Sequence, residues 1–313
     1  MSGEDELLCR LRGRLGPSSL IGDDAAVLSP SGPIAVTVDS QIAGVHFVPD
    51  LDPAHVARRL LAVNLSDLAA MGADPAWAFL ALSAPPGFDH DHFLRAFTAA
   101  CDRYGVTLAG GDLSRCDQLV TTLTLIGTKP EGRRWLRRNQ AKPGDDLWLG
   151  GTVGESAAGR ILIDRGGPAT VPPSLHRVAR RAVRRHLLPQ PQLELGRWLG
   201  DQKTDIGCMD VSDGVARDLH RLCRESGTGA EVHAEDLSFS DRFVDLTRAI
   251  SADPFDLALS GGEDYVLIFT LPPGVQPPSG CKKIGTITEK KAITLVRDGR
   301  RLRLPAAGWD HLK

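Results

Sequence analysis

The stretch Asn64-Leu65-Ser66-Asp67-Leu68-Ala69-Ala70-Met71-Gly72-Ala73-Asp74-Pro75 decides how the first half of this chain folds. We expect it to form the end of a helix that begins near Pro53, because apolar residues recur on one helical stripe. These residues are Val56, Leu60, Val63 and Met71. Gly72 stands where a helix C-terminal cap is expected, and Pro75 prevents an easy continuation of the helix.

Two polar residues, Asn64 and Asp67, interrupt this otherwise apolar helix. They are three positions apart and therefore neighbours on the helix surface. A carboxylate in apolar surroundings is costly unless a cation or several hydrogen-bond donors meet it. Asp67 is therefore either a solvated or ion-paired side chain or a metal ligand, and the other acidic sites along the chain decide between these readings.

The composition limits the class of protein. The 313 residues allow two domains of ordinary size, and 42% hydrophobic residues can form large cores. A formal net charge of -2 provides no basic field that would attract nucleic acid, and it gives no reason to expect a membrane surface.

The cysteines and the N-terminus indicate a compartment. The six cysteines are widely spaced and form no Cys-x-x-Cys pair, which argues against a zinc site or a disulfide framework and favours a reducing, cytoplasmic location. The acidic N-terminus predicts no signal peptide. No apolar run of about 18 residues predicts a membrane span.

Helix-like and strand-like segments alternate along the chain, with hairpin-like strand pairs among them. We expect helices over 4–14, 53–71, 90–104, 156–164, 175–187, 215–226 and 243–250. We expect strands over 33–38, 76–82, 106–109, 119–126, 146–149, 208–211, 230–233, 266–270, 283–287 and 293–296. This pattern favours mixed α and β layers over an all-parallel doubly wound sheet. A basic, glycine- and proline-rich segment at 129–144 predicts a boundary between domains 1–137 and 138–313.

Carboxylates recur where a predicted strand meets a glycine turn or a helix. They are Asp23 and Asp24 after Gly22, Asp39 at the end of a strand, Asp112 after Gly110-Gly111, Asp210 and Asp213 before Gly214, and Glu263 and Asp264 after Gly261-Gly262. No Lys or Arg accompanies them in the sequence. If these groups converge in space, their mutual repulsion requires divalent cations, and Mg²⁺ suits carboxylate, phosphate and water oxygens.

Other chemistry-bearing patterns are weaker or missing. The glycine-rich segment 150–155 precedes a predicted helix and either binds a phosphate or only forms a turn. The arginines of the helix predicted over 175–187 have no aromatic residues among them, so we interpret them as a solvated face. The chain has no Walker phosphate loop, no kinase catalytic loop and no Gly-x-Ser-x-Gly elbow. The nine histidines lie mostly in polar segments and are surface residues by default, except that His46 shares a loop region with Asp39.

Taken in order, these motifs resemble those of the thiamine-monophosphate kinase family, from about Gly3 to His311. The matching motifs are IGDDAAV at 21–27, GVHF at 44–47, NLSDLAAMGADP at 64–75, GGD at 110–112, VSDG at 211–214 and SGGEDY at 260–265. A weaker likeness extends to aminoimidazole ribonucleotide synthetases and selenophosphate synthetases.

The resemblance implies a homodimeric enzyme that uses ATP and several Mg²⁺ ions. It implies direct transfer of the γ-phosphate to thiamine monophosphate, which gives thiamine diphosphate without a side-chain nucleophile. In the family, N-terminal domains pair through their sheets and bind nucleotide and metal. The C-terminal α/β domain closes over the site, in an aminoimidazole ribonucleotide synthetase-like fold.

The resemblance also assigns site residues by motif match. The implied metal ligands are Asp24, Thr37, Asp39, Asp67, Asp112, Asp210 and Asp213. The implied ATP contacts are Gly111, Asp112, Arg138 and Ser212. The implied contacts to the thiamine substrate are His46, Glu263 and Trp309. Val38 replaces a residue that is often Thr in the family, so it offers a metal only its backbone carbonyl.

Two alternatives stay open at this stage. The chain could be another ATP-dependent synthetase of the same superfamily, acting on a different small molecule. Against the selenophosphate synthetases, Cys9 lies on a predicted amphipathic helix and we interpret it as a packing residue. The chain could also be a sensor that binds ATP and Mg²⁺ without turnover.

Overall fold

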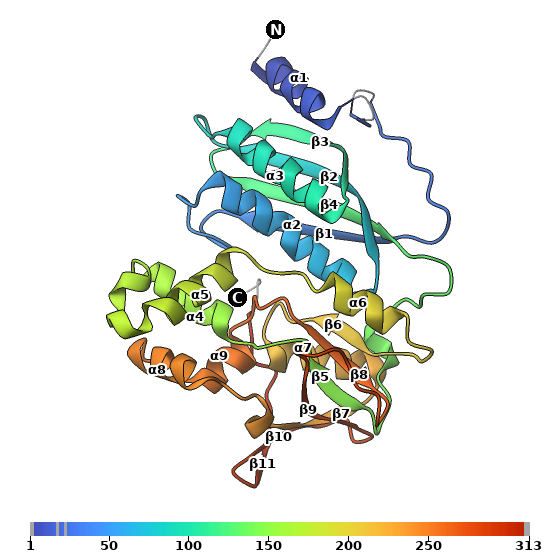
Figure 1. Cartoon of the computed structure of the whole chain (residues 1–313), viewed down its shortest axis with the longest axis vertical. Coiled ribbons are helices and arrows are strands. Elements are labelled where there is room, and N and C mark those ends of the chain that lie inside the picture. The colour runs from blue at the N-terminus through green and yellow to red at the C-terminus, as the bar shows by residue number, and fades with distance from the viewer. Residues whose placement is uncertain (1–2, 17–18, 22–23, 310–313) are drawn as a thin grey trace. The chain divides into compact units, whose positions relative to one another are not determined.

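A computed structural model describes residues 3–16, 19–21 and 24–309, and these form two compact units (Figure 1). The first unit comprises Met1–Leu68 and Ala73–Glu131, and the second comprises Ala69–Gly72 and Gly132–Lys313. Each unit contains a mixed β-sheet with helices, which confirms the predicted mixed α/β class. No helix in the described part of the chain is long and apolar enough to cross a membrane.

The first unit is built on a four-stranded sheet. Its strands are β1 (Ala35–Ile42), β2 (Asp74–Ala84), β3 (Thr107–Arg115) and β4 (Val120–Thr128). Their order is β1-β4-β2-β3, with β2 and β3 parallel and the other neighbours antiparallel. The helices are α1 (Gly3–Leu15), α2 (Pro53–Ala70) and α3 (His90–Tyr104), of which α2 and α3 lie on one face of the sheet (Figure 1).

Helix α2 forms where the opening motif predicts it. The Asp52 carboxylate accepts the Ala54 N–H at 2.7 Å, so it satisfies a free amide at the N-terminus. Gly72 ends the helix with φ +68°, and Ala73 N–H donates to Leu68 O at 2.9 Å, which is a Schellman cap. The prediction of a buried helix that ends at Gly72 is confirmed.

Strand pairing in the first sheet shows that two predicted strand ends are wrong. Asp39 does not end a strand, because β1 continues to Ile42 and Asp39 pairs with Leu123 in the middle of it. The glycines before Asp112 do not end a strand either, because β3 continues to Arg115 after a bulge. On β4, Thr121 and Leu123 lie on the buried face. Period-two alternation places odd-numbered residues of β4 on that face.

The second unit is built on a seven-stranded sheet. Its strands are β5 (Asp146–Leu149), β6 (Cys208–Asp210), β7 (Gly229–His233), β8 (Leu267–Leu271), β9 (Lys282–Thr288), β10 (Ile293–Arg297) and β11 (Arg300–Arg303). Their order is β11-β10-β7-β9-β5-β8-β6, and only the β10–β7 pair among these is parallel. The α-helices are α4 (Glu155–Asp164), α5 (His176–Leu187), α6 (Leu193–Gly200), α7 (Val215–Ser226), α8 (Asp241–Ala249) and α9 (Pro254–Ser260).

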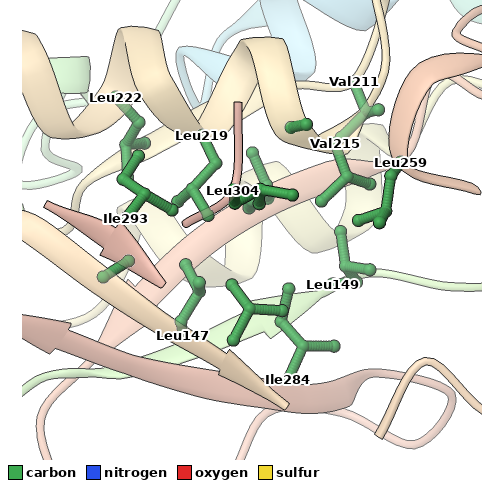
Figure 2. Packing of buried hydrophobic residues seen from close by; sticks show 14 of the residues in the cluster. Leu147, Leu149, Val211, Val215, Leu219, Leu222, Leu259, Ile284, Ile293 and Leu304 are labelled. Carbon is green, nitrogen blue, oxygen red and sulfur yellow. The ribbon is translucent and has the colours of Figure 1, made fainter. Parts of the chain in front are cut away.

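The core of the second unit lies between the sheet and α7. Leu219 and Leu222 of α7 pack with Leu147 and Ile284 of the central strands, and all four are fully buried (Figure 2). A second apolar cluster joins α4, α5, α8 and α9 and includes Leu162 and Leu246. The two clusters hold the loops before α7 and after α9 in place.

Three elements of the second unit were not predicted. Helices α6 and α9 have only eight and seven residues, so they repeat their apolar positions too few times to give a clear helical period. Strand β11 is fully exposed and arginine-rich, so its sequence lacks the alternation of a half-buried strand.

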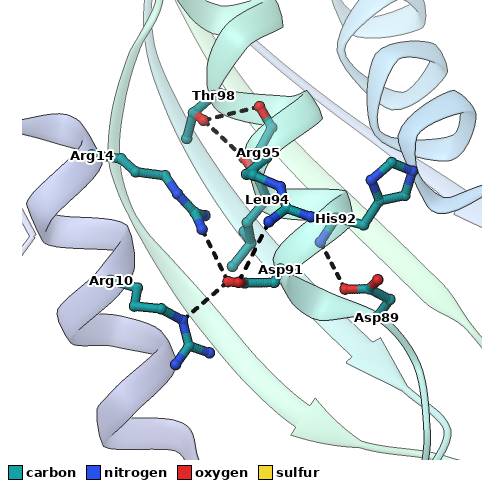
Figure 3. A network of polar contacts seen from close by, with 8 residues as sticks. All are labelled: Arg10, Arg14, Asp89, Asp91, His92, Leu94, Arg95 and Thr98. Carbon is teal, nitrogen blue, oxygen red and sulfur yellow. Dashed lines mark hydrogen bonds and ion pairs between the residues drawn. The ribbon is translucent and has the colours of Figure 1, made fainter.

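Charged side chains at the edge of the first unit join α1 to α3. Arg10, Arg14 and Arg95 surround Asp91 at 3.3, 3.1 and 3.8 Å (Figure 3). Exposed ion pairs of this kind contribute about 0–1 kcal/mol each. The apolar face of α3 therefore dominates its attachment, with Phe93 and Phe97 fully buried.

Candidate functional site

In the first unit, α2 meets β1 through polar side chains. Thr37 Oγ1 donates a hydrogen bond of 2.5 Å to Asp67 Oδ2. Further along the same pair of elements, Arg59 Nε donates to Gln41 Oε1 at 2.9 Å, and both side chains are buried. Since alternate residues of a strand share a face, Asp39 lies between these two contacts on the side of β1 that meets α2.

This arrangement bears on the two readings of Asp67, of which the metal-ligand reading stays a prediction. Asp67 is half-buried and bonded to a hydroxyl, so it is not simply a solvated side chain. Thr37, Asp39 and Asp67 supply only oxygen donors, which is the donor set that a hard cation such as Mg²⁺ prefers. The residues present on this face therefore fit the metal that the sequence suggests.

Asp112 lies apart from these residues within one chain. The pairing register aligns Asp112 with Ala81, Thr122 and Ser40, so its side chain is on the opposite face from Asp39. It is also three strand intervals away from β1, or roughly 14 Å. Asp112 is exposed and accepts a hydrogen bond from Ser114 Oγ at 2.6 Å.

Gly111 explains why β3 bulges beside Asp112. Its backbone approaches Leu80 so closely that a Cβ atom there would lie 1.9 Å from Leu80 O. Gly111 is therefore required by strand packing, whatever its role toward a ligand.

The remaining predicted residues of the first unit lie in loops. Asp24 is in an exposed bend before β1, while Gly22 and Asp23 lie outside the described residues. His46 follows β1, and its Nδ1 accepts the Ile42 N–H at 3.1 Å, which leaves Nε2 to carry the proton of the neutral ring. Within residues 3–16, 19–21 and 24–309, no group of three or more His, Cys, Asp and Glu residues lies close enough to hold a metal ion.

In the second unit, a loop at Ser212–Gly214 joins β6 to α7. The Asp218 carboxylate accepts the N–H groups of Ser212 and Asp213 at 3.0 and 2.9 Å. Asp218 is completely buried, and this burial raises its pKa to about 6. Asp210 lies just before the loop at the end of β6 and is buried as well.

Asp213 has a cation beside it. Its carboxylate lies 2.6 Å from Arg221, which also contacts Asp218 at 2.7 Å. The expectation that no Lys or Arg accompanies the acidic junctions is therefore wrong for Asp213, because Arg221 reaches it in space. Arg221 lies eight residues away on the first two turns of α7, where spacing alone does not single it out.

The loop at Gly261–Tyr265 packs directly against the first loop. Glu263 N–H donates to Ser212 O at 2.7 Å, and a Cβ at Gly262 would lie 2.6 Å from the same oxygen. Glu263 and Tyr265 have φ of +58° and +51°, which is uncommon for residues other than glycine. Such backbone conformations persist only where the surroundings enforce them, and they cluster at functional sites.

Trp309, in the C-terminal segment, contacts the loop at Ser212–Gly214 and the start of α7. Its N–H donates to Asp213 O at 3.2 Å, and Arg217 donates to its carbonyl. The indole is 53% exposed. The second unit therefore brings together four predicted site residues: Ser212, Asp213, Glu263 and Trp309.

Arg138 is exposed in a short 3₁₀ turn at Arg138–Gln140. Ser226 at the end of α7 donates its hydroxyl to Arg138 O at 2.6 Å and accepts the Ala141 N–H at 3.1 Å. The positive charge of Arg138 and the negative charge of Asp210 both act on the pKa of Cys208, which burial raises strongly.

The glycine-rich segment 150–155 forms a turn that another side chain occupies. Gly154 and Ser156 donate their N–H groups to the two oxygens of Asp264 at 2.7 and 3.2 Å. Burial raises the pKa of Asp264 to about 7. The N-terminus of α4 is thus capped by a carboxylate from within the chain, so of the two interpretations of this segment the structure favours the turn.

His186 is a candidate site residue that the sequence analysis missed. Only 2% of it is exposed, against the expectation that histidines in polar segments lie at the surface. Its Nδ1 lies 3.3 Å from Glu263 Oε2 and 3.3 Å from Ser156 Oγ. Five arginines make the sequence of α5 polar, so the burial of His186 could not be predicted from it. His186 lies on the buried side of this helix.

The fold and these loops define a class. Residues 22–128 match the family profile described as AIR synthase related protein, N-terminal domain. The hydrogenase maturation protein HypE in complex with ATP shares the fold, with a TM-score of 0.76 at 18% identity over 99% of this chain and 97% of that one. The chain therefore has an AIR synthase-like α/β fold.

Full-length relatives narrow this class. The chain is 38% identical to thiamine-monophosphate kinase of Salmonella typhimurium and 39% identical to that of Escherichia coli K12, over 99% of this chain and 98% of each relative. The chain belongs to the thiamine-monophosphate kinase family.

Solved structures of the family agree with this assignment. Thiamine-monophosphate kinase from Stenotrophomonas maltophilia has a TM-score of 0.80 at 33% identity, over 96% of this chain and 98% of that one. AaThiL complexed with AMPPCP and TMP has a TM-score of 0.79 at 29% identity, over 99% of this chain and 97% of that one.

Proposed function

We propose that this chain phosphorylates thiamine monophosphate to thiamine diphosphate by direct, in-line transfer of the γ-phosphate of ATP. The observation that carries the proposal is identity of 38–39% to thiamine-monophosphate kinases over 99% of the chain. The likeness to AaThiL, a structure complexed with AMPPCP and TMP, supports the pairing of a nucleotide with a phosphate-bearing acceptor.

Several Mg²⁺ ions would be held by carboxylates and one hydroxyl. The proposed ligands are Asp24, Thr37, Asp39, Asp67, Asp112, Asp210 and Asp213. The hydrogen bond between Thr37 and Asp67 supports the first-unit part of this set, because it orients the Asp67 carboxylate. When bound, the ions would neutralise the phosphates of ATP and spread the charge that develops during transfer.

ATP and the acceptor would contact separate groups of residues. The proposed ATP contacts are Gly111, Asp112, Arg138 and Ser212, in which Arg138 offers a bidentate fork to phosphate oxygens. The proposed contacts to thiamine monophosphate are His46, Glu263 and Trp309. The exposed indole of Trp309 supports stacking on a ring of thiamine, and the carboxylate of Glu263 supports attraction of its cationic thiazolium.

The chemistry needs no side-chain nucleophile and no strong general base. The acceptor phosphate is already ionised near neutral pH, since the second pKa of a phosphate monoester is about 6. One of its oxygens forms a bond to the γ-phosphorus, the bond to the β-bridging oxygen breaks, and ADP leaves. Positioning and electrostatic stabilisation would then supply most of the rate enhancement.

A homodimer belongs to the same proposal. The face of the first sheet opposite α2 carries Val36 and Val38, which are 55% and 58% exposed. We call it the Val38 face; it also carries Ser40, Ala81 and Asp112. Pairing of two copies through this face would bury both valines and would bring Asp112 of each copy to the interface.

The two domains would have different functions. Domain 1–137 would bind ATP and metal and form the dimer, and domain 138–313 would close over the site. A reducing, cytoplasmic location would suit the six cysteines, which are all free thiols.

A product assay tests the proposal. Purified protein with ATP, Mg²⁺ and thiamine monophosphate should give thiamine diphosphate in chromatography after oxidation to fluorescent thiochromes. Folded protein that gives no product would reject the proposal. If calorimetry still detects binding of ATP and Mg²⁺ by that protein, the sensor alternative replaces it. If ADP forms only with another small-molecule acceptor, the alternative superfamily synthetase replaces it.

A further inference from the structure

Glu263 is held by contacts on both its backbone and its side chain. Its N–H donates to Ser212 O at 2.7 Å, and its φ of +58° fixes an uncommon backbone conformation. Its side chain is 26% exposed, and one carboxylate oxygen, Oε2, lies 3.3 Å from His186 Nδ1. One side of the carboxylate thus faces a buried imidazole, while part of the group stays accessible.

His186 itself is fixed by the packing of α5 on α4. Gly159 of α4 approaches Ala182 so closely that a Cβ at Gly159 would lie 2.1 Å from Ala182 O. Arg181 and Arg185 of α5 both contact Glu155 at the start of α4, at 3.0 and 3.4 Å. These contacts set the rotation of α5 and direct the side of the helix that carries His186 inward.

Ser156 completes the arrangement around the imidazole. Ser156 is fully buried, and its Oγ lies 3.3 Å from the same Nδ1 that faces Glu263. The Ser156 backbone N–H donates to Asp264, the residue that follows Glu263. The start of α4 therefore contacts the loop at Glu263 both directly, through Asp264, and through His186.

We propose that His186 is a positioning residue that orients the Glu263 carboxylate for binding of the thiamine monophosphate acceptor. This inference rests on the proposed function, which assigns Glu263 to the acceptor. An Nδ1–H directed at Oε2 restricts the rotamers of Glu263 and so fixes the direction in which its partly exposed carboxylate meets the acceptor. Because only 2% of His186 is exposed, its side chain is not placed to form a contact surface for the acceptor. Its effect on binding therefore passes through Glu263.

The test compares two amide substitutions that differ in reach. In His186→Asn, the side-chain amide nitrogen lies near the position of the imidazole Nδ1 and can replace it as a donor to Glu263. In His186→Gln, the amide nitrogen lies near the position of Nε2 instead. The Asn and Gln side chains are polar and no larger than that of His, so both can be accommodated at this buried polar position. A matched control is His176→Gln on the same helix, because the His176 ring contacts the carbonyl of Val171 at 3.0 Å.

Steady-state kinetics are measured with thiamine monophosphate and ATP varied in turn. We expect His186→Gln to raise KM for thiamine monophosphate about tenfold, with KM for ATP and kcat within about twofold. We expect His186→Asn and His176→Gln to stay within about threefold of the parent chain in all three parameters. An unchanged KM for thiamine monophosphate in His186→Gln, or an equal rise of KM for ATP, would overturn the inference.

A double-mutant cycle with Glu263→Gln gives the second readout. If His186 acts through Glu263, the two substitutions should be non-additive, so that His186→Gln raises KM little further in the Glu263→Gln background. Full additivity would contradict the inference. Failure of the proposed function is distinguishable, because the unsubstituted chain would then form no thiamine diphosphate at all.

Discussion

Two aspartates, the buried Asp218 and the half-buried Asp264, perform the same task at different loops. Each carboxylate accepts two backbone N–H groups, of Ser212 and Asp213 in one case and of Gly154 and Ser156 in the other. An uncompensated carboxylate at these depths would be strongly unfavourable, so the hydrogen bonds are what make it tolerable. The aspartates thereby fix the loops that carry the candidate site residues.

The raised pKa of Asp264 predicts a pH-dependent stability. Burial raises this pKa from 3.8 to about 7, so the folded chain binds the proton more tightly than the unfolded chain. The contribution of Asp264 to stability is therefore complete below about pH 4 and is lost as the pH rises through about 7. Relative to Asp264→Asn, the free energy of unfolding of the parent chain should fall by about 1.4 kcal/mol per pH unit within this window.

Urea unfolding of both proteins at several pH values measures this difference. Asp256→Asn is the control, since Asp256 is exposed on the neighbouring helix α9. If the free energy of unfolding of the parent chain stays constant relative to that of Asp264→Asn from pH 4 to pH 7, or rises relative to it, the assignment is contradicted.

Asp67 predicts a loss of activity without a loss of fold. Asparagine at this position can still accept the hydrogen bond from Thr37, but it removes the negative charge that a Mg²⁺ ion requires. Asp67→Asn should lower kcat at least about 100-fold, with a melting temperature within a few degrees of the parent chain. Asp102→Asn on the exposed side of α3 is the control. Turnover of Asp67→Asn at the parent rate would remove Asp67 from the metal site.

At the scale of elements, the close contact of α4 and α5 depends on one glycine. Gly159 lies in the middle of α4, where glycine is otherwise unfavourable, and its missing side chain makes room for the Ala182 carbonyl. The clash distance of 2.1 Å involves backbone, which cannot rotate away. The two helices must therefore move apart if a methyl group is added.

Gly159→Ala should lower the free energy of unfolding by about 1–3 kcal/mol. Gly13→Ala is a matched control, because Gly13 also lies within a helix but has no atoms within 4 Å of an added Cβ. That substitution should raise stability by up to about 1 kcal/mol, since alanine favours the helix. Urea denaturation distinguishes the two, and equal effects of both substitutions would contradict the packing argument.

The long, periodic elements could be predicted from the sequence, and the reason is local. Helices α2, α3 and α7 carry apolar stripes and end at glycines with positive φ, namely Gly72, Gly105 and Gly227. Strands β1 and β3 were predicted too short because Asp39 and the Gly110–Asp112 segment interrupt the apolar pattern. Their continuation depends on pairing with β4 and β2, which local sequence does not reveal.

The candidate site could be predicted only in part, because its contacts join distant segments. The motifs singled out Ser212, Glu263 and Trp309, and the second unit brings these together. The ion pair of Arg221 with Asp213 and the buried His186 escaped prediction, since each depends on how a helix is rotated in the fold. Roles toward metal and nucleotide stay predictions that rest on the family motifs.

At the scale of the whole molecule, the Val38 face predicts association. Two large valines more than half exposed on one sheet face are unfavourable in water, and pairing of two copies would bury them. Val38→Glu should therefore yield a monomer in size-exclusion chromatography with light scattering, whereas the parent chain should be a dimer. Val27→Glu is the control, because Val27 is 84% exposed in a loop outside the sheet. A Val38→Glu protein that stays dimeric would exclude this face as the interface.

The most direct measurement of the central claim follows the phosphate itself. ATP that carries radioactive phosphorus only in its γ-phosphate is mixed with Mg²⁺, thiamine monophosphate and an excess of the purified protein, and the products are separated after one turnover. Direct transfer predicts that the label appears in thiamine diphosphate, with one ADP for each labelled product. Label released as inorganic phosphate, while thiamine monophosphate stays unchanged, would contradict the account.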